Sequence, residues 1–377
     1  MTHDNSNAEL ALAALNHQPV KGIPIGLFHI MEHRIIEQLA ECKPGSYKND
    51  PYAVYIRMLQ KVGVCLVDQM LAENPLSMGD HGYEADSDVS RSAGPVCLDG
   101  KLIDSPEACA EHMEANLFPQ IREAITQFRH EATVQSIINQ ESQSQQLLGP
   151  NILKTGHGQL TFPHLLYTLY GYEPFFMAYA LYPDMIDRLF SYQADLAALH
   201  NQAVVEAYQR AGRPLYHRLD HDMADSRGLL VSLQSLQRSW LPQFYRSIQP
   251  AVKAGFKLLW HCDGNLMDLI PDLLACGVNG FQGFQYEDGM DYVKICQMRA
   301  KNGDPLIIQA GLSVTRELPL GKPADVKRQM AFLVEQGPMT GLFLSLSSSC
   351  APGTPWENIK TAVEGMNFYR QHGRLTR

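Results

Sequence analysis

The feature that most constrains the fold of this chain is a recurring alternation of short apolar runs with segments of helical periodicity. A turn bearing Gly, Asp, Asn or His follows most runs, and several runs are apolar throughout, as strands buried on both faces are. This alternation is typical of parallel βα units. Eight runs are predicted to be strands: 22–28, 62–67, 152–155, 214–219, 257–260, 280–284, 306–310 and 341–346.

Eight strands with intervening helices predict an α/β fold, a single closed (β/α)8 barrel of the TIM type. The 377 residues exceed a minimal barrel, so we expect additions to it. These are an N-terminal helical extension and an elaboration around residues 71–150, with loop or hairpin at 73–95 and helices at 105–144. The chain, 1–377, is expected to be one domain. An open doubly wound sheet is the alternative, but no Gly-x-Gly-x-x-Gly turn follows the first strand.

Composition and charge disfavour several classes of protein, namely nucleic-acid-binding, membrane and secreted proteins. The net charge is −9, which disfavours nucleic acid and anionic membrane as partners. No apolar run approaches 18 residues, and the first 20 residues lack the pattern of a secretory signal. The eight cysteines are unevenly spaced, as thiols of a cytoplasmic protein would be. We therefore expect a cytoplasmic protein with a small-molecule substrate. Its oligomeric state is left open, with a homodimer among the options.

Polar and thiol side chains cluster just after the predicted strands. In such a barrel the carboxyl ends of all strands meet at one face, where the chemistry is found. In strand order these residues are Arg34; His157; Asp220, His221 and Asp222; His261, Cys262 and Asp263; Gln285 and Tyr286; and Cys350.

His261 and Cys350 would face each other across the mouth of the barrel. An imidazole and a thiolate both suit Zn²⁺, with Cys262 or Asp263 as a third ligand and one position open for substrate. Such an ion would activate a substrate thiol or act as a Lewis acid. The alternative is a packed turn, with Cys350 as a small buried side chain.

The turn of Asp220, His221 and Asp222 could transfer protons, bind a metal or bind substrate. Alternatively, it is a solvated loop that caps the following helix. His157, between two glycines, is either catalytic or part of a tight turn. Arg34 either binds a carboxylate or starts an exposed helix.

Several segments carry a family resemblance: Trp-His-Cys-Asp-Gly-Asn at 260–265, the stretch 269–280 with Gln285, and the segments 9–25, 170–175, 220–222 and 354–359. Together they resemble the uroporphyrinogen decarboxylase superfamily over nearly the whole chain. The resemblance implies a TIM-like barrel with its site in the cleft at the carboxyl ends of the strands.

The branches of that superfamily differ in their motifs. The decarboxylase branch has an arginine-rich segment after the first strand, where this chain keeps only Arg34, and a Gly-His-Gly after the last strand, where it has Ser348-Ser349-Cys350. The methyltransferase branch binds zinc through His-x-Cys-Gly and a later Cys. His261 and Cys350 match this pattern, but Asp263 replaces the second Cys and Cys262 lies one place early.

The resemblance therefore implies a zinc-dependent methyltransferase that moves a methyl group between a small substrate and a thiol or a corrinoid protein. The corrinoid would belong to a separate chain, since no Asp-x-His-x-x-Gly motif is present. One alternative is a metal-free decarboxylase acting on a small carboxylate or tetrapyrrole-like substrate, and another is a non-catalytic binding barrel. The expected roles are catalytic for Asp222, His157 and Asp220, substrate-binding for His221, Gln285, Tyr286 and Arg34, and metal-binding for His261, Cys350, Asp263 and Cys262.

The scarcity of arginines among the residues that follow the predicted strands yields a first prediction. A tetrapyrrole with eight carboxylates needs several cations, so uroporphyrinogen should bind poorly and should not be turned over. Incubation of the pure protein with uroporphyrinogen, followed by chromatography of the porphyrins, checks this. Formation of coproporphyrinogen would favour the decarboxylase branch instead.

Overall fold

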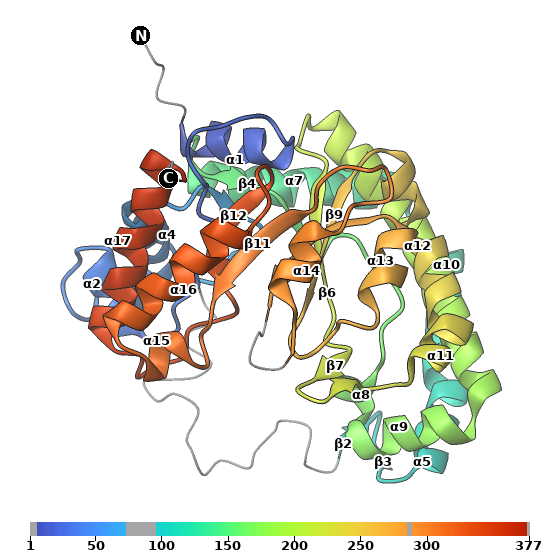
Figure 1. The fold of residues 1–377 in the computed structure, drawn as a ribbon. Helices are drawn as coiled ribbons and strands as arrows, with labels where there is room; N and C mark the ends of the chain where they lie inside the picture. Colours follow the sequence, from blue (N-terminus) through green and yellow to red (C-terminus); the bar gives the residue numbers. More distant parts are fainter. Residues whose placement is uncertain (1–5, 73–95, 285–288, 375–377) are drawn as a thin grey trace.

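The computed structural model describes residues 6–72, 96–284 and 289–374. A parallel sheet lies at the centre, with helices packed around it (Figure 1). Six of its strands are hydrogen-bonded in the order β12-β11-β10-β9-β6-β5. They are β5 (Gly156–His157), β6 (Tyr216–Asp220), β9 (Lys257–Cys262), β10 (Val278–Gly283), β11 (Ile307–Leu312) and β12 (Leu342–Leu346).

Shorter segments extend this sheet. β1 (Leu66–Val67) pairs in parallel with β4 (Leu153–Lys154), and β4 leads through Thr155 into β5. The predicted first strand at 22–28 forms no regular ladder, and Ile25 makes a single bridge to Leu344 of β12. Pro24 within this segment has no N–H to donate to a neighbouring strand. The structure thus shows a mixed α/β fold with a curled parallel sheet, in which the predicted first strand is irregular.

Contacts across the inner face show the curl of the sheet. Tyr216 of β6 and Gln309 of β11 lie on strands that are not neighbours, yet the Gln309 side-chain amide donates to the Tyr216 hydroxyl at 2.8 Å. At Gly26 a Cβ atom would lie 2.7 Å from the Ser345 hydroxyl, so only glycine fits. Because strand side chains alternate in direction, the inner face also receives Arg218 and Asp220, two and four residues after Tyr216.

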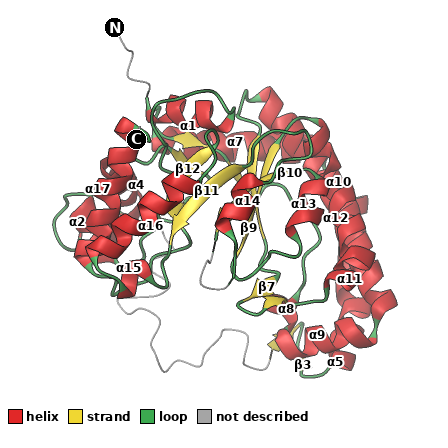
Figure 2. Cartoon of the chain, viewed as in Figure 1, coloured by secondary structure: helices red, strands yellow, loops and turns green. Residues whose placement is uncertain are grey.

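Helices surround the sheet (Figure 2). Several begin at a side chain that accepts a hydrogen bond from the first helical turn, as Ser6, Asp50 and Ser105 do. The helices are α1 (Asn7–Leu15), α2 (His33–Leu39), α3 (Ser46–Asn49), α4 (Pro51–Val62), α5 (Pro106–His112), α6 (Phe118–Thr126), α7 (His130–Leu148), α8 (Tyr167–Tyr170), α9 (Tyr172–Leu181), α10 (Pro183–Arg210), α11 (Leu233–Ser235), α12 (Leu241–Lys253), α13 (Ile270–Cys276), α14 (Tyr292–Gln297), α15 (Glu317–Leu320), α16 (Pro323–Gln336) and α17 (Trp356–His372). Among those described, none is both long enough and apolar enough to cross a bilayer.

The additions to the sheet match the expected regions in part. Helix α1 is the N-terminal extension, and α5, α6 and α7 are the predicted helices of the elaboration. The loop or hairpin expected at 73–95 lies outside the described residues. An antiparallel hairpin of β2 (Val96–Leu98) and β3 (Lys101–Ile103) follows it, and a second hairpin of β7 (Ala224–Asp225) and β8 (Gly228–Leu229) follows β6.

Aromatic packing joins the outer face of the sheet to its helices. Trp260 of β9 lies against Phe244 of α12 and against Phe162, with ring centroids 5.4 and 5.3 Å apart. Trp240 stacks on Phe244 at 4.7 Å and donates from its indole N–H to the carbonyl of Pro163. This packing fixes the segment around 162, which leads toward the carboxyl ends of the strands.

A buried ion pair beneath the sheet allows a test of stability. Lys154 of β4 and Glu141 of α7 pair at 2.9 Å, and both side chains are 5% exposed. Lys154→Met leaves the Glu141 carboxylate buried and unpaired, so we expect the free energy of unfolding to fall by about 3–5 kcal/mol. Urea denaturation followed by circular dichroism measures it. Lys61→Met, which breaks the exposed pair with Glu41, is the matched control and should change stability little. Equal losses in the two variants would contradict the prediction.

Candidate functional site

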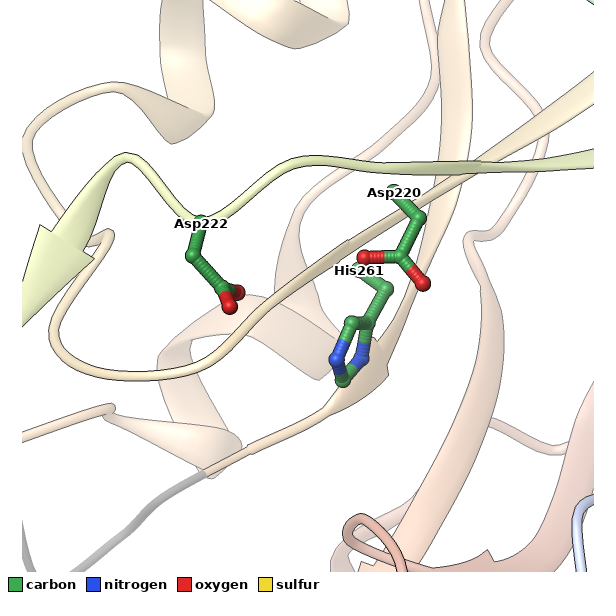
Figure 3. Close-up of side chains that lie close together, drawn as sticks. All are labelled: Asp220, Asp222 and His261. Carbon is green, nitrogen blue, oxygen red and sulfur yellow. The ribbon is translucent and has the colours of Figure 1, made fainter. Parts of the chain in front are cut away.

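Asp220 and His261 are brought together by strand register. They lie at the carboxyl ends of the neighbouring parallel strands β6 and β9, and their Cα atoms are direct partners in the ladder, so both side chains point to the inner face. Asp222 lies two residues beyond, and its carboxylate accepts a hydrogen bond from the backbone N–H of Asp263 at 2.8 Å. One ligand atom from each of Asp220, Asp222 and His261 lies within 4.8 Å of the others (Figure 3). We call these three residues the Asp–Asp–His cluster.

A buried arginine holds the first of these carboxylates. The guanidinium of Arg218 donates to Asp220 at 2.6 Å and to Asp68 at 2.7 Å, and its third hydrogen bond goes to the side chain of Gln69 at 3.0 Å. The side chains of Arg218 and Asp68 are each 3% exposed. A buried guanidinium is stable only when its donors are paired, so this contact fixes Asp220 in one orientation.

Asp220 is held in its ionised form. Burial by itself would raise its pKa, but the hydrogen bond with His157 and the electrostatic interactions with His261 and Arg218 outweigh burial and bring the pKa well below its usual range. The contact between His157 Nε2 and the Asp220 carboxylate measures 3.4 Å. Asp220 is therefore an acceptor or ligand at neutral pH, not a proton donor.

A second, buried histidine, His217, helps to position His157. The ring of His217 accepts hydrogen bonds at Nε2 from the backbone N–H groups of Gln159 and Leu160, at 3.2 and 2.9 Å. A Cβ atom at Gly156 would overlap with that ring, so the glycine lets β5 pass close to it. His157 is thus set beside Arg218, its register partner on β6.

The imidazole of His261 is buried, and only one of its two ring nitrogens has a polar contact among the described residues. Its side chain is 10% exposed, and Nε2 lies 3.8 Å from an Asp263 carboxylate oxygen. Within the part of the chain that the structure describes, Nδ1 has no hydrogen-bond partner. Gly283 of β10 makes room for the ring, since a Cβ there would lie 3.2 Å from Nδ1. A buried nitrogen without a partner calls for a ligand, a water or an ion.

The two cysteines predicted as ligands are outside the Asp–Asp–His cluster. Cys262 follows His261 on the same strand and points to the opposite face, where its sulfur accepts from the backbone N–H of Met223 at 3.3 Å. The Cys350 thiol contacts the Thr354 hydroxyl at 3.2 Å, and burial raises its pKa to about 11. Both thiols are therefore held protonated at neutral pH, because burial also raises the pKa of Cys262.

The residues predicted to bind substrate lie in different environments. His221 is buried, and its Nε2 accepts a hydrogen bond from the backbone N–H of Leu165 at 2.9 Å. Arg34 is 80% exposed and pairs with Glu32 at 3.0 Å. Gln285 and Tyr286 lie outside the described residues.

Sequence reasoning missed Asp68 and Arg218. Both have sequence features that could have identified them. Asp68 immediately follows a predicted strand, and Arg218 is a charged residue inside a predicted strand, where it requires a buried partner. Its partner is 150 positions away, so only the fold identifies it.

Comparisons with known proteins identify the fold. No sequence profile of a protein family matches the chain, and no characterised protein matches it significantly in sequence. The structure is similar to a methyltransferase from Methanosarcina mazei, with 15% identity and a TM-score of 0.56 over 97% of this chain and 99% of that one. A more distant likeness is to a B12-independent methionine synthase from Shewanella sp. W3-18-1, with 11% identity, a TM-score of 0.34, and coverage of 63% and 65%. The first likeness confirms, at the level of the fold, the resemblance found in the sequence.

The buried histidines predict how stability depends on pH. Burial, followed by the nearby His164, lowers the pKa of His221 to about 3, whereas an unfolded histidine titrates near 6.5. The folded protein keeps this ring neutral, so its stability is complete above pH 6.5 and falls as the pH drops toward 3. One such group accounts for about 1.4 kcal/mol per pH unit in that window.

We therefore expect His221→Gln, which can still accept from Leu165, to have a shallower loss of stability between pH 6.5 and 4 than the unaltered protein. Urea titrations at each pH measure the slope. The exposed His130 provides the control, and His130→Gln should leave the slope nearly unchanged. An unaltered slope in His221→Gln would show that the ring is not held neutral.

Proposed function

We propose that this chain is an enzyme that transfers a methyl group between a small substrate and a thiol or a separate corrinoid protein, and that the Asp–Asp–His cluster binds the divalent ion, Zn²⁺, on which the transfer depends. One observation carries the proposal. Two carboxylates and a buried imidazole converge at the carboxyl ends of β6 and β9, on a fold shared with a methyltransferase. This is the end of a parallel sheet at which active sites form.

The residues present fit such an ion. Zn²⁺ accepts imidazole nitrogen and carboxylate oxygen as ligands. Asp220 is ionised, and His261 has a buried nitrogen without a hydrogen-bond partner among the described residues. Asp220, Asp222 and His261 would hold the ion, with Asp263 beside them. When bound, the ion would lower the pKa of a coordinated thiol and so favour its reactive thiolate form.

His157 is assigned to proton transfer. In the tautomer that donates from Nε2 to Asp220, Nδ1 carries a lone pair that can accept the proton of the thiol. The sulfur then forms a bond to the methyl carbon, while the bond between that carbon and its donor atom breaks and leaves its electron pair on the donor. Asp220 stabilises the imidazolium that results.

The proposal includes a closed barrel formed by one domain. The segment 24–27 supports it, because its backbone is hydrogen-bonded to β12. The N–H of Gly26 donates to the carbonyl of Leu344, and the N–H of Leu346 donates to the carbonyl of Leu27. On the other side of this segment, the backbone N–H of Cys65 donates to the carbonyl of Ile25.

A reducing, cytoplasmic setting is also part of the proposal, and the absence of disulfides among the eight cysteines supports it.

The experiment uses free methylcobalamin as methyl donor and coenzyme M as the thiol, under anaerobic conditions. With Zn²⁺ added, the protein should accelerate the transfer, which is followed by the absorbance change of the corrinoid. His261→Ala and Asp222→Asn should each lose at least about tenfold in zinc affinity and in rate, since two ligands hold zinc poorly.

Cys350→Ala separates the two possible ligand sets. It should retain zinc, because the Cys350 thiol contacts Thr354 and lies outside the cluster. Loss of zinc in Cys350→Ala would instead support the His261 and Cys350 pair expected from the sequence. If the protein neither retains zinc after dialysis nor accelerates the transfer, the proposed function is wrong.

A further inference from the structure

Three aromatic side chains lie beside the Asp–Asp–His cluster, and we call them the aromatic wall. Tyr167 of α8 donates from its hydroxyl to the backbone carbonyl of Asp222 at 2.8 Å. Its ring centroid lies 4.7 Å from that of Tyr172 and 5.7 Å from that of Phe176, both on α9. The rings of Tyr172 and Phe176 are 5.9 Å apart. The three rings thus form one packed group attached to the turn that carries Asp222.

The aromatic wall is anchored at one end and open at the other. Tyr167 is buried, Phe176 is half-buried and Tyr172 is 44% exposed. Burial and then the negative charge of Asp222 raise the pKa of Tyr172. A ligand from solvent therefore meets an aromatic surface whose position is fixed by its neighbours.

The charges around this surface favour a cation. Among the described residues, no lysine or arginine forms an ion pair with Asp222. The guanidinium of Arg218 is already shared between Asp68 and Asp220, and Arg227 is exposed and paired with Asp225. The unpartnered Nδ1 of the buried His261 is a separate sign that the cluster binds something.

We propose that the aromatic wall and Asp222 bind the methylated ammonium group of a substrate. This inference rests on the proposed methyl transfer and names the class of methyl donor, a quaternary ammonium compound. Such a group has no N–H to donate, so aromatic faces and a nearby carboxylate are the groups that recognise it. In the transfer, an N–CH₃ bond breaks, its electron pair stays on nitrogen to give a tertiary amine, and the methyl carbon bonds to the thiolate sulfur.

Choline and its neutral isostere 3,3-dimethylbutan-1-ol test the recognition of charge without any methyl transfer. By isothermal titration calorimetry, choline should bind at least about tenfold more tightly than the isostere. Tyr172→Leu should weaken choline binding about tenfold, whereas Tyr172→Phe, which keeps the ring, should change it less than about threefold. Tyr245→Leu is the matched control, because Tyr245 is 42% exposed on α12 and lies away from the cluster, and it should bind choline normally.

The outcomes separate this inference from the proposed function. Equal binding of choline and its isostere, or equal losses in Tyr172→Leu and Tyr245→Leu, would overturn the aromatic wall as a cation site. If methyl transfer from methylcobalamin occurs but choline does not bind, the inference fails and the proposed function stands. If choline binds in a Tyr172-dependent way without any methyl transfer, the site stands and the proposed function fails. Circular dichroism checks folding, and Phe176→Leu replaces Tyr172→Leu if that variant unfolds.

Discussion

The guanidinium of Arg218, buried inside the curled sheet, is the group on which the arrangement of the site depends. A charge removed from water is tolerated only when it is paired and its donors are bonded. Here the partners are Asp68, which directly follows β1, and Asp220, the last residue of β6. The need to pair one cation therefore joins two distant parts of the chain and sets the position and the charge of Asp220. His157 and His261 then lie beside a carboxylate that is already ionised.

Neutral histidines hold the segment that follows β5 against the sheet. His217 and His221, both on or next to β6, accept backbone N–H groups of the segment 159–165. Each ring must stay neutral to accept these hydrogen bonds, and burial keeps it so. The segment they hold leads directly into α8, which carries Tyr167. The aromatic wall beside Asp222 thus depends on hydrogen bonds made by side chains that face away from the cluster.

The ligand atoms that the fold gathers are oxygen and nitrogen, while the thiols remain in the surrounding core. Carboxylates and an imidazole bind a divalent ion without requiring a low-pKa cysteine, and they leave the site with an excess of negative charge. The same carboxylates that would hold a metal thus also favour a cationic substrate. Both proposals follow from the excess of negative charge at the site. They differ in the other side chains involved, which are His261 for the metal and the aromatic wall for the cationic substrate.

The sequence by itself determined the class of fold and the end of the sheet at which polar residues gather. Apolar runs that alternate with helical segments can bury both faces only as parallel strands, and the residue that follows each strand is then placed at one edge. His261, Asp220 and Asp222 were identified as candidates in this way. Only the tertiary structure decided which of the candidates meet, because strand register pairs Asp220 with His261, and alternation turns Cys262 to the opposite face. Arg218 and Asp68 become partners through a contact that spans 150 positions, and no local pattern records such a contact.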